Sequence, residues 1–130
     1  MKPYNRGITF ITADPIHHGH IMLINLASQL CDHLIVCVAS DEDIRERKNR
    51  EPYFELKQRL LATSCIKGIS ELGIQEHKDK LKCIEDHAPD VIFVSEEYKD
   101  KDWDGKELGL PVHYLPYTKG VSSTHLRNTL

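Results

Sequence analysis

The residues with the clearest capacity for chemistry are two histidines, His17 and His20, in the segment DPIHHGH at residues 14–20. A three-residue spacing on a helical turn places both side chains on one face. The start of a helix offers unpaired N–H groups and a partial positive charge, and both suit an anion. Gly19 lets the backbone approach a phosphate without a Cβ in the way. Imidazole donors aimed at an α-phosphate stabilise a five-coordinate transition state, so the pattern indicates phosphate chemistry.

The same histidines are open to two other interpretations. His17, His18 and His20 supply nitrogen ligands of the kind that zinc takes, and a zinc-binding domain is one alternative. A chance cluster of histidines is the other. The strand–turn–helix context described below favours the phosphate interpretation.

A second signal lies near the end of the chain, in the segment LPYTKGVSST at residues 115–124. By themselves the hydroxyl residues are an ordinary cap of a closing helix. Combined with the histidine segment, they predict a second set of donors for phosphate. The residues concerned are Gly120, Ser122, Ser123 and Thr124.

The elements that must position these residues alternate between strand and helix. Short apolar and β-branched runs predict strands at 7–12, 33–39, 69–74, 91–95 and 112–115. Helical spacing of apolar residues predicts helices at 18–30, 55–66, 78–87 and 122–130. The charged residues 40–52 indicate a surface loop with room for one helical turn. We therefore expect one α/β domain over residues 1–130, a Rossmann-like, doubly wound parallel sheet of about five strands. Its ligand site should lie beyond the carboxyl ends of the strands.

Composition limits the classes of partner. The 130 residues are 40% hydrophobic and 28% charged with a net charge of −3, which argues against disorder and gives no long-range attraction to nucleic acid or membrane. A phosphate ligand therefore needs a local basic cluster. The four cysteines show no C-x-x-C pair, so we expect buried, reduced thiols. Without a signal pattern or an apolar run long enough for a membrane span, a cytoplasmic protein is expected.

The two motifs in this order resemble the nucleotidyltransferase superfamily, and within it the bacterial glycerol-3-phosphate cytidylyltransferase group. That group carries T-F-D-x-x-H-x-G-H near its start and R-T-E-G-I-S-T-T near its end. The resemblance extends over nearly the whole chain. It implies transfer of CMP from CTP to a phosphorylated small alcohol with release of pyrophosphate, Mg²⁺ as cofactor, and a homodimer.

The resemblance also implies roles for individual residues. His17 and His20 would contact the triphosphate and stabilise the transition state, and Ser122, Ser123 and Thr124 would hold its β- and γ-phosphates. The residues matching T-F-D would lie near the nucleotide, with Asp14 close to the metal. The basic loop and the next helix would add cations at the phosphates or the acceptor. The residues matching T-F-D are Thr12, Ala13 and Asp14. The cations are Lys48 and Arg50 in the basic loop and Arg59 in the next helix.

The chain departs from the group at several positions. Ile11 and Ala13 replace a glycine and a phenylalanine of the first motif, and Tyr117 replaces the arginine of the second, so Lys119 would have to supply that phosphate contact. The segment SEEY at residues 95–98 replaces one that often borders the base. Two alternatives to a cytidylyltransferase therefore stay open. One is an adenylyltransferase using ATP, of the heptose-phosphate, flavin, pantetheine-phosphate or nicotinate-mononucleotide type, and the other is a non-catalytic nucleotide-binding domain.

Overall fold

The computed structural model of the chain describes residues 2–76, 80–103 and 105–116. Its centre is a five-stranded, wholly parallel sheet in the order β3-β2-β1-β4-β5. The strand order reverses at β1, as in a doubly wound sheet, so the predicted fold class is confirmed. The strands are β1 (Tyr4–Ile11), β2 (Cys31–Ala39), β3 (Glu71–Gln75), β4 (Val91–Ser95) and β5 (Val112–Leu115).

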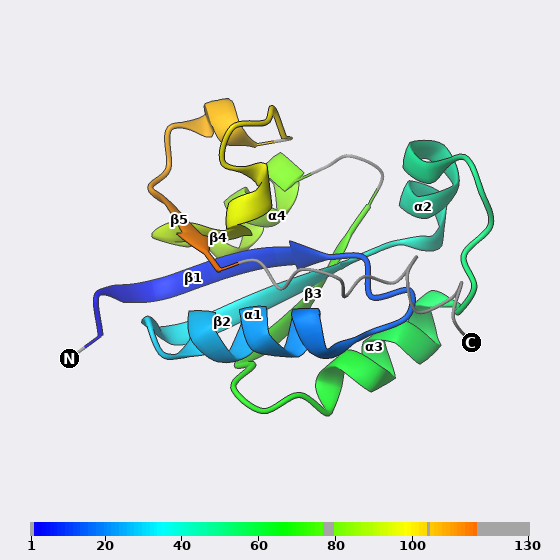
Figure 1. The fold of residues 1–130 in the computed structure, drawn as a ribbon, viewed down its shortest axis with the longest axis horizontal. Helices are drawn as coiled ribbons and strands as arrows, with labels where there is room; N and C mark the ends of the chain where they lie inside the picture. The colour runs from blue at the N-terminus through cyan, green and yellow to red at the C-terminus, as the bar shows by residue number, and fades with distance from the viewer. Residues whose placement is uncertain (1, 77–79, 104, 117–130) are drawn as a thin grey trace.

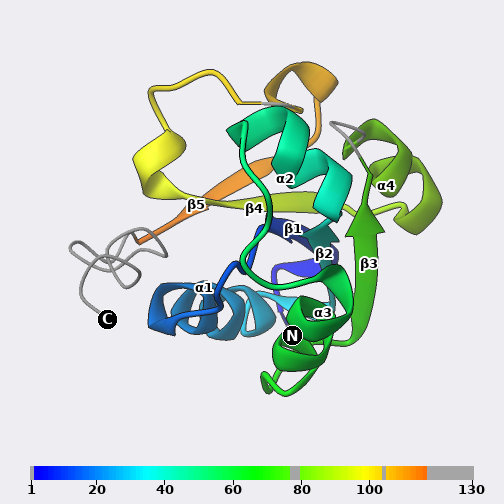
Figure 2. The same cartoon turned by 90° about the vertical axis from the view of Figure 1, so that its right-hand side faces the viewer.

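Helices cover both faces of this sheet, as Figure 1 shows. On one face lie α1 (His18–Ser28) and α3 (Leu56–Ser64), and on the other lies α4 (Lys80–His87) together with two short 3-10 turns, η1 (Glu96–Tyr98) and η2 (Lys106–Leu108). The remaining helix, α2 (Asp41–Lys48), stands beyond the carboxyl end of β2 (Figure 2). No helix among the described residues has the length and apolar character needed to cross a membrane.

Side chains alternate between two cores, because successive residues of a strand point to opposite faces. Leu34, Val36 and Val38 of β2 join Ile24 and Ala27 of α1 in the core under α1 and α3. In the core under α4, Ile35 and Cys37 of β2 pack with Ile8 of β1, Ile92 of β4 and Cys83 of α4. Burial on both faces explains why β2 is an almost unbroken apolar run.

The charged segment at residues 40–52 differs from its prediction as a loop, since Asp41–Lys48 form a helix. The order of the charges along the helix explains the difference, because acidic residues at its start and basic residues at its end interact favourably with the helix dipole. Ser40 caps the helix by accepting the N–H of Asp43 at 3.0 Å, the first turn is acidic, and the last turn is basic. Asn49 then ends it in a left-handed conformation.

The cysteines follow their prediction with one exception. Cys31, Cys37 and Cys83 are buried thiols, whereas Cys65 is exposed. Cys65 is the residue at which α3 ends, beyond the part of the helix that faces the sheet. Its neighbourhood in the sequence is apolar, but the helix turns this particular side chain towards solvent.

Candidate active site at the carboxyl edge of the sheet

His17 and His20 form a closed pair at the start of α1. His17 caps the helix, and its Nδ1 accepts the N–H of Gly19 at 3.0 Å. In return, Nδ1 of His20 accepts the N–H of His17 at 3.1 Å. The two ring centroids lie 4.0 Å apart. The spacing therefore brings both imidazoles together at one helix start, as the sequence predicted.

These hydrogen bonds decide which nitrogen of each ring carries its proton. Since each Nδ1 accepts a backbone N–H, the neutral ring must be protonated at Nε2, and within the described residues neither Nε2 has a partner. Burial, together with the charges of His17 and Lys48, lowers the pKa of His20 from 6.5 to about 3. Burial and the charge of neighbouring His18 also lower the pKa of His17. At neutral pH the pair thus presents two uncharged N–H donors.

Gly19 is required for a reason that the sequence did not indicate. A Cβ at this position would lie 2.7 Å from Cε1 and 3.0 Å from Nδ1 of His17. The imidazole therefore occupies the space that a side chain would need. Gly19 allows the His17 ring to fold back over the helix start and accept its amide.

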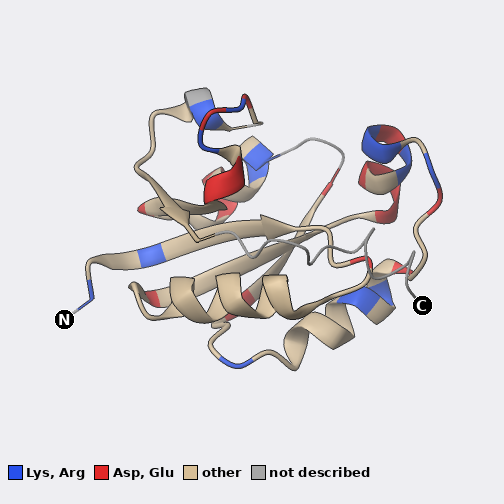
Figure 3. Cartoon of the chain, in the orientation of Figure 1, with Lys and Arg blue, Asp and Glu red and all other residues tan. Residues whose placement is uncertain are grey.

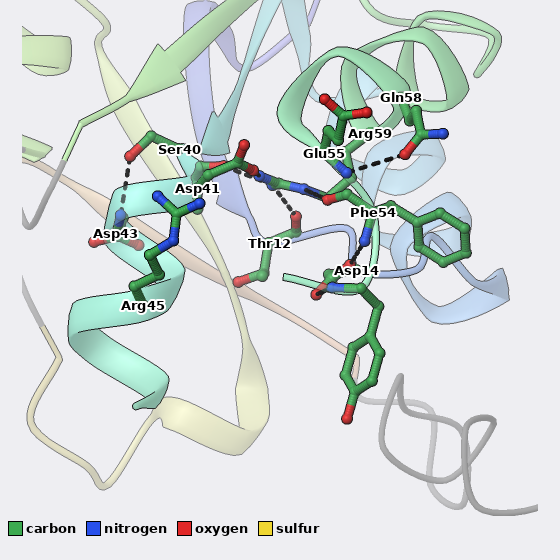
Figure 4. Close-up of polar contacts among 12 residues, drawn as sticks. Thr12, Asp14, Ser40, Asp41, Asp43, Arg45, Phe54, Glu55, Gln58 and Arg59 are labelled. Atoms are coloured by element: carbon green, nitrogen blue, oxygen red, sulfur yellow. Dashed lines mark hydrogen bonds and ion pairs between the residues drawn. The ribbon is translucent and has the colours of Figure 1, made fainter. Parts of the chain in front are cut away.

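Asp14, predicted close to the nucleotide and its metal, fastens the loop that follows β1 to the segment before α3. Its Oδ1 accepts the N–H of Phe54 at 2.9 Å, and its Oδ2 accepts the N–H of Tyr53 at 3.0 Å and Nη1 of Arg50 at 2.8 Å. Burial raises the pKa of Asp14, but these donors lower it by more, so the group is ionised at neutral pH. The contact between Asp14 and Phe54 is visible in Figure 4.

Arg59 was expected to act on the reacting phosphates, and the structure gives it a different place. The residue is 1% exposed. Its Nη1 donates to the carbonyls of Thr12 and Ala39 at 2.9 and 2.6 Å, its Nε to the carbonyl of Phe54 at 2.8 Å, and its Nη2 to Asp41 at 2.7 Å. Four contacts and full burial leave no surface for a ligand in this conformation. In this structure the Arg59 guanidinium is bound to the protein itself, and a catalytic role for Arg59 stays a prediction.

The position of Arg59 has a structural consequence instead. Thr12 and Ala39 follow or end the neighbouring strands β1 and β2, where carbonyls lack ladder partners. One guanidinium satisfies both carbonyls and also holds Asp41 at the start of α2 (Figure 4). Arg59 is thus a positioning residue for the loop after β1 and for α2.

The predicted cations Lys48 and Arg50 do lie at this edge. Lys48 ends α2, and its charge acts on His20. Arg50 donates to Asp14 and stacks 4.6 Å from the ring centre of Tyr53. Sequence reasoning missed Arg47, whose Nη2 donates to the hydroxyl of Thr12 at 3.0 Å. The signal that was available is its position in the last turn of α2, where basic residues gather (Figure 3).

Two predictions find partial answers here. In the described residues, no group of three or more His, Cys, Asp or Glu side chains is placed to hold a metal ion, and His18 is exposed. The zinc alternative therefore has no geometric support in this part of the chain. The predicted phosphate-binding residues of the second motif, with Tyr117, lie outside the described residues: Lys119, Gly120, Ser122, Ser123 and Thr124.

Comparison with known proteins shows the family of the chain. The profile described as cytidylyltransferase-like matches residues 9–129, a span that includes both motifs. The chain belongs to this family. As a cytidylyltransferase-like protein it is a nucleotidyltransferase, as predicted.

Individual relatives agree with the family. Glycerol-3-phosphate cytidylyltransferase of Bacillus subtilis is 33% identical over 128 residues, with 95% of each chain covered. FAD synthase of Pyrococcus abyssi is 34% identical over 108 residues, covering 80% of this chain and 71% of its own. Among solved structures, a lipopolysaccharide core biosynthesis protein from Thermoplasma volcanium superimposes with a TM-score of 0.71 at 25% identity, covering 88% of this chain and 97% of its own.

Proposed function

We propose that this cytidylyltransferase-like chain transfers CMP from CTP to glycerol 3-phosphate or a closely related phosphorylated alcohol, releasing pyrophosphate. The observation that carries the proposal is the pair of Nε2–H donors of His17 and His20 at the start of α1, which no described residue accepts. The similarity to glycerol-3-phosphate cytidylyltransferases over 95% of both chains supports the choice of substrates.

The chemistry follows from this geometry. An oxygen of the acceptor's phosphate attacks the α-phosphorus in line, a new P–O bond forms, and the bond to pyrophosphate breaks. No covalent enzyme intermediate is needed. His17 and His20 donate hydrogen bonds to the oxygens of the α-phosphate, whose charge grows in the transition state. Because both rings are neutral with their protons on Nε2, they act by charge stabilisation, and no proton leaves them.

Mg²⁺ is the cofactor that the family resemblance implies, where it would neutralise the charge of the triphosphate. The two oxygens of Asp14 already accept three N–H donors, and the described residues form no metal cage. Mg²⁺ often binds through substrate phosphates and retains several waters. We therefore propose that it arrives on the triphosphate. Asp14 as its ligand stays a prediction, as do the homodimer and the cytoplasmic location.

A pyrophosphate-release screen tests the function directly. Purified protein with Mg²⁺ is incubated with each of the four nucleoside triphosphates and a panel of phosphorylated alcohols and sugars. We expect the fastest release with CTP and glycerol 3-phosphate. CTP should also give the largest thermal stabilisation, since a ligand that binds only the folded state raises stability with its affinity. Binding of CTP without any turnover would favour the non-catalytic alternative.

Adenylyl transfer is the second candidate, favoured by the similarity to FAD synthases of Pyrococcus abyssi and Ferroglobus placidus, at 34% and 31% identity. A larger thermal shift with ATP, together with ATP-dependent pyrophosphate release, would overturn the cytidylyl assignment. The roles of the two histidines would be unchanged, because both reactions proceed at an α-phosphate.

A further inference from the structure

Two buried cysteines meet at the contact between α4 and the sheet, in a part of the molecule that the proposed reaction does not use. Cys37 of β2 and Cys83 of α4 both pack in the core under α4, and Cys37 is fully buried. A hydrogen bond between the two thiols, together with burial, raises the pKa of Cys37. Neither cysteine is in a disulfide in this structure. The two sulfur atoms are therefore within reach of each other, although they belong to elements far apart in the sequence.

A histidine held by a carboxylate lies beside this pair. Nδ1 of His87 and Oε2 of Glu71 form an ion pair at 2.6 Å. A carboxylate at Nδ1 keeps the proton on that nitrogen, so Nε2 of the neutral ring can accept another proton. Among the described residues, Nε2 of His87 has no hydrogen-bond partner. The ring thus has the orientation that a general base requires.

Gly73 of β3 leaves the space in which the histidine and the thiols come together. A Cβ at this position would lie 2.8 Å from Sγ of Cys37 and 3.0 Å from Nε2 of His87. Cys83 contacts the same stretch of β3, because its thiol donates to the carbonyl of Ile74 at 3.5 Å. Cys83 and His87 are four residues apart on α4, which places them on one face of the helix. All three groups therefore gather over Gly73.

Solvent reaches one of the two thiols more readily than the other. Cys83 and His87 line a cavity of about 210 Å³, and its other lining residues are exposed: Ile74, Glu76, Lys82 and Asp86. This volume is several times that of a water molecule, about 30 Å³, so it admits a molecule of two or three heavy atoms. Cys37 has no exposed surface. A small oxidant can therefore meet Cys83 first, with Cys37 behind it.

We propose that Cys83 and Cys37 form a redox-active pair, which a small peroxide such as hydrogen peroxide oxidises to a disulfide with His87 as the base. His87 accepts the thiol proton of Cys83, and the thiolate attacks one peroxide oxygen as the O–O bond breaks. The leaving hydroxide takes that proton from His87 and becomes water. The sulfur of Cys37 then attacks the sulfenic sulfur, the S–O bond breaks, and a second water leaves with the Cys37 proton. The two thiols lose two electrons, which reduce one peroxide to two waters.

Mass spectrometry of the folded chain tests this site. Cys65→Ser is the background, because the exposed Cys65 would otherwise react by itself and cross-link molecules. The protein is treated with hydrogen peroxide at neutral pH, alkylated, and digested without reductant. We expect two thiols to be lost together, a disulfide joining the peptides of Cys37 and Cys83, and full recovery with dithiothreitol. In Cys37→Ser, oxidation should stop at a sulfenic acid on Cys83, which dimedone traps.

The rate of oxidation tests the base. His87→Gln should slow it by roughly 100-fold, the scale of a lost general base. His33→Gln changes the other ring on Glu71, and as the matched control it should stay within about twofold of the wild type under the same reasoning. Equal rates in His87→Gln and the wild type would overturn the role of His87.

Two further outcomes would overturn the pair itself. One is a folded protein whose buried thiols all stay reduced, or form a disulfide that does not join Cys37 to Cys83. The other is a rate that follows the unfolded fraction in urea, because the thiols would then react only after global unfolding. A rate that is independent of low urea concentrations is the result expected of a site built into the native fold.

Discussion

Two pairs of histidines stand at opposite ends of the sheet and have different partners. At the carboxyl edge, Nδ1 of His17 and of His20 each accept a backbone amide. At the amino edge, His33 and His87 share the carboxylate of Glu71, with contacts of 2.9 and 2.6 Å. Burial keeps the first pair neutral, and among the described residues its Nε2 atoms have no partner. In the second pair each ring gives one nitrogen to the carboxylate of Glu71. The partner of an imidazole therefore decides what its other nitrogen can do.

The largest expected effect concerns the scaffold of the carboxyl edge. Arg59→Met should lower the free energy of unfolding by about 3 kcal/mol or more, because it leaves two strand-end carbonyls and Asp41 without their donor. Urea denaturation measures the change. Lys57→Met, at an exposed position of the same helix, is the control and should have little effect. Equal stability of both variants would contradict the positioning role of Arg59.

The next effect separates the two histidine pairs by activity. His17→Ala and His20→Ala should each lower kcat by roughly 100-fold or more, the scale of one lost transition-state donor. His33→Ala and His87→Ala, at the other end of the sheet, should stay within about twofold of the wild type under the same reasoning. Turnover close to the wild type in a folded His17 or His20 variant would exclude that residue from the mechanism.

A finer comparison is available at position 20. Asn places an oxygen near Nδ1 and can accept the His17 amide, whereas Gln places its amide nitrogen near Nε2 and can donate to a phosphate. We expect His20→Gln to retain more activity than His20→Asn, and kcat measures the order. The reverse order would mean that the helix cap matters more than the donor.

Gly19→Ala should lower turnover by less than the histidine variants do, and it should not lower the stability as Arg59→Met does. The new Cβ would meet the His17 ring at 2.7 Å and displace it, and we expect kcat to fall by about tenfold. Alanine favours helix over glycine by about as much as the lost His17 cap costs, so the melting temperature should change little. Asn25→Ala, exposed on the same helix, controls for helix propensity. A loss of stability with unchanged kcat would contradict this account of Gly19.

The two pairs also differ in their response to pH. Because the folded-state pKa of His20 lies near 3 and its ordinary value is 6.5, the folded protein resists its protonation, and stability falls as pH drops below 6.5. An NMR titration should therefore show the His20 ring neutral down to about pH 5. A midpoint near the ordinary value would refute the neutral-donor mechanism.

The smallest effect belongs to the amino edge. The hydrogen bond from His33, with help from His87, lowers the pKa of Glu71 below its ordinary 4.5. Its stabilisation is therefore complete above 4.5 and is lost as pH falls through the lower folded value. Glu71 is 37% exposed, so screening limits the cost of Glu71→Gln to about 0.2–1 kcal/mol, and salt should reduce it. A larger cost at high salt would contradict a surface ion pair.

The sequence alone determined the features that depend on local periodicity. The apolar runs of β2 and β4 and the helical spacing in α1 predicted a parallel sheet with helices on both faces. The spacing of His17 and His20 predicted a shared face, because residues three apart on a helix are neighbours whatever the rest of the fold does. The prediction of a loop at 40–52 was wrong for Asp41–Lys48, which form a helix. The Ser40 cap and the order of its charges along the helix dipole stabilise this helix, although it lacks an apolar periodicity.

Only the tertiary structure decided which charged residues are buried in the scaffold and which stay partly exposed at the carboxyl edge. Arg47, Arg50 and Arg59 are equally basic in the sequence. In the structure Arg59 is buried against strand ends, Arg50 is bound to Asp14, and Arg47 is bound to Thr12 and stays partly exposed. The physical reason is that the partners that distinguish them lie 18 to 47 residues away along the chain, on other elements. These partners are Thr12, Asp14, Ala39 and Asp41. A long side chain follows whichever carbonyl or carboxylate folding brings within reach, and no local pattern encodes that distance.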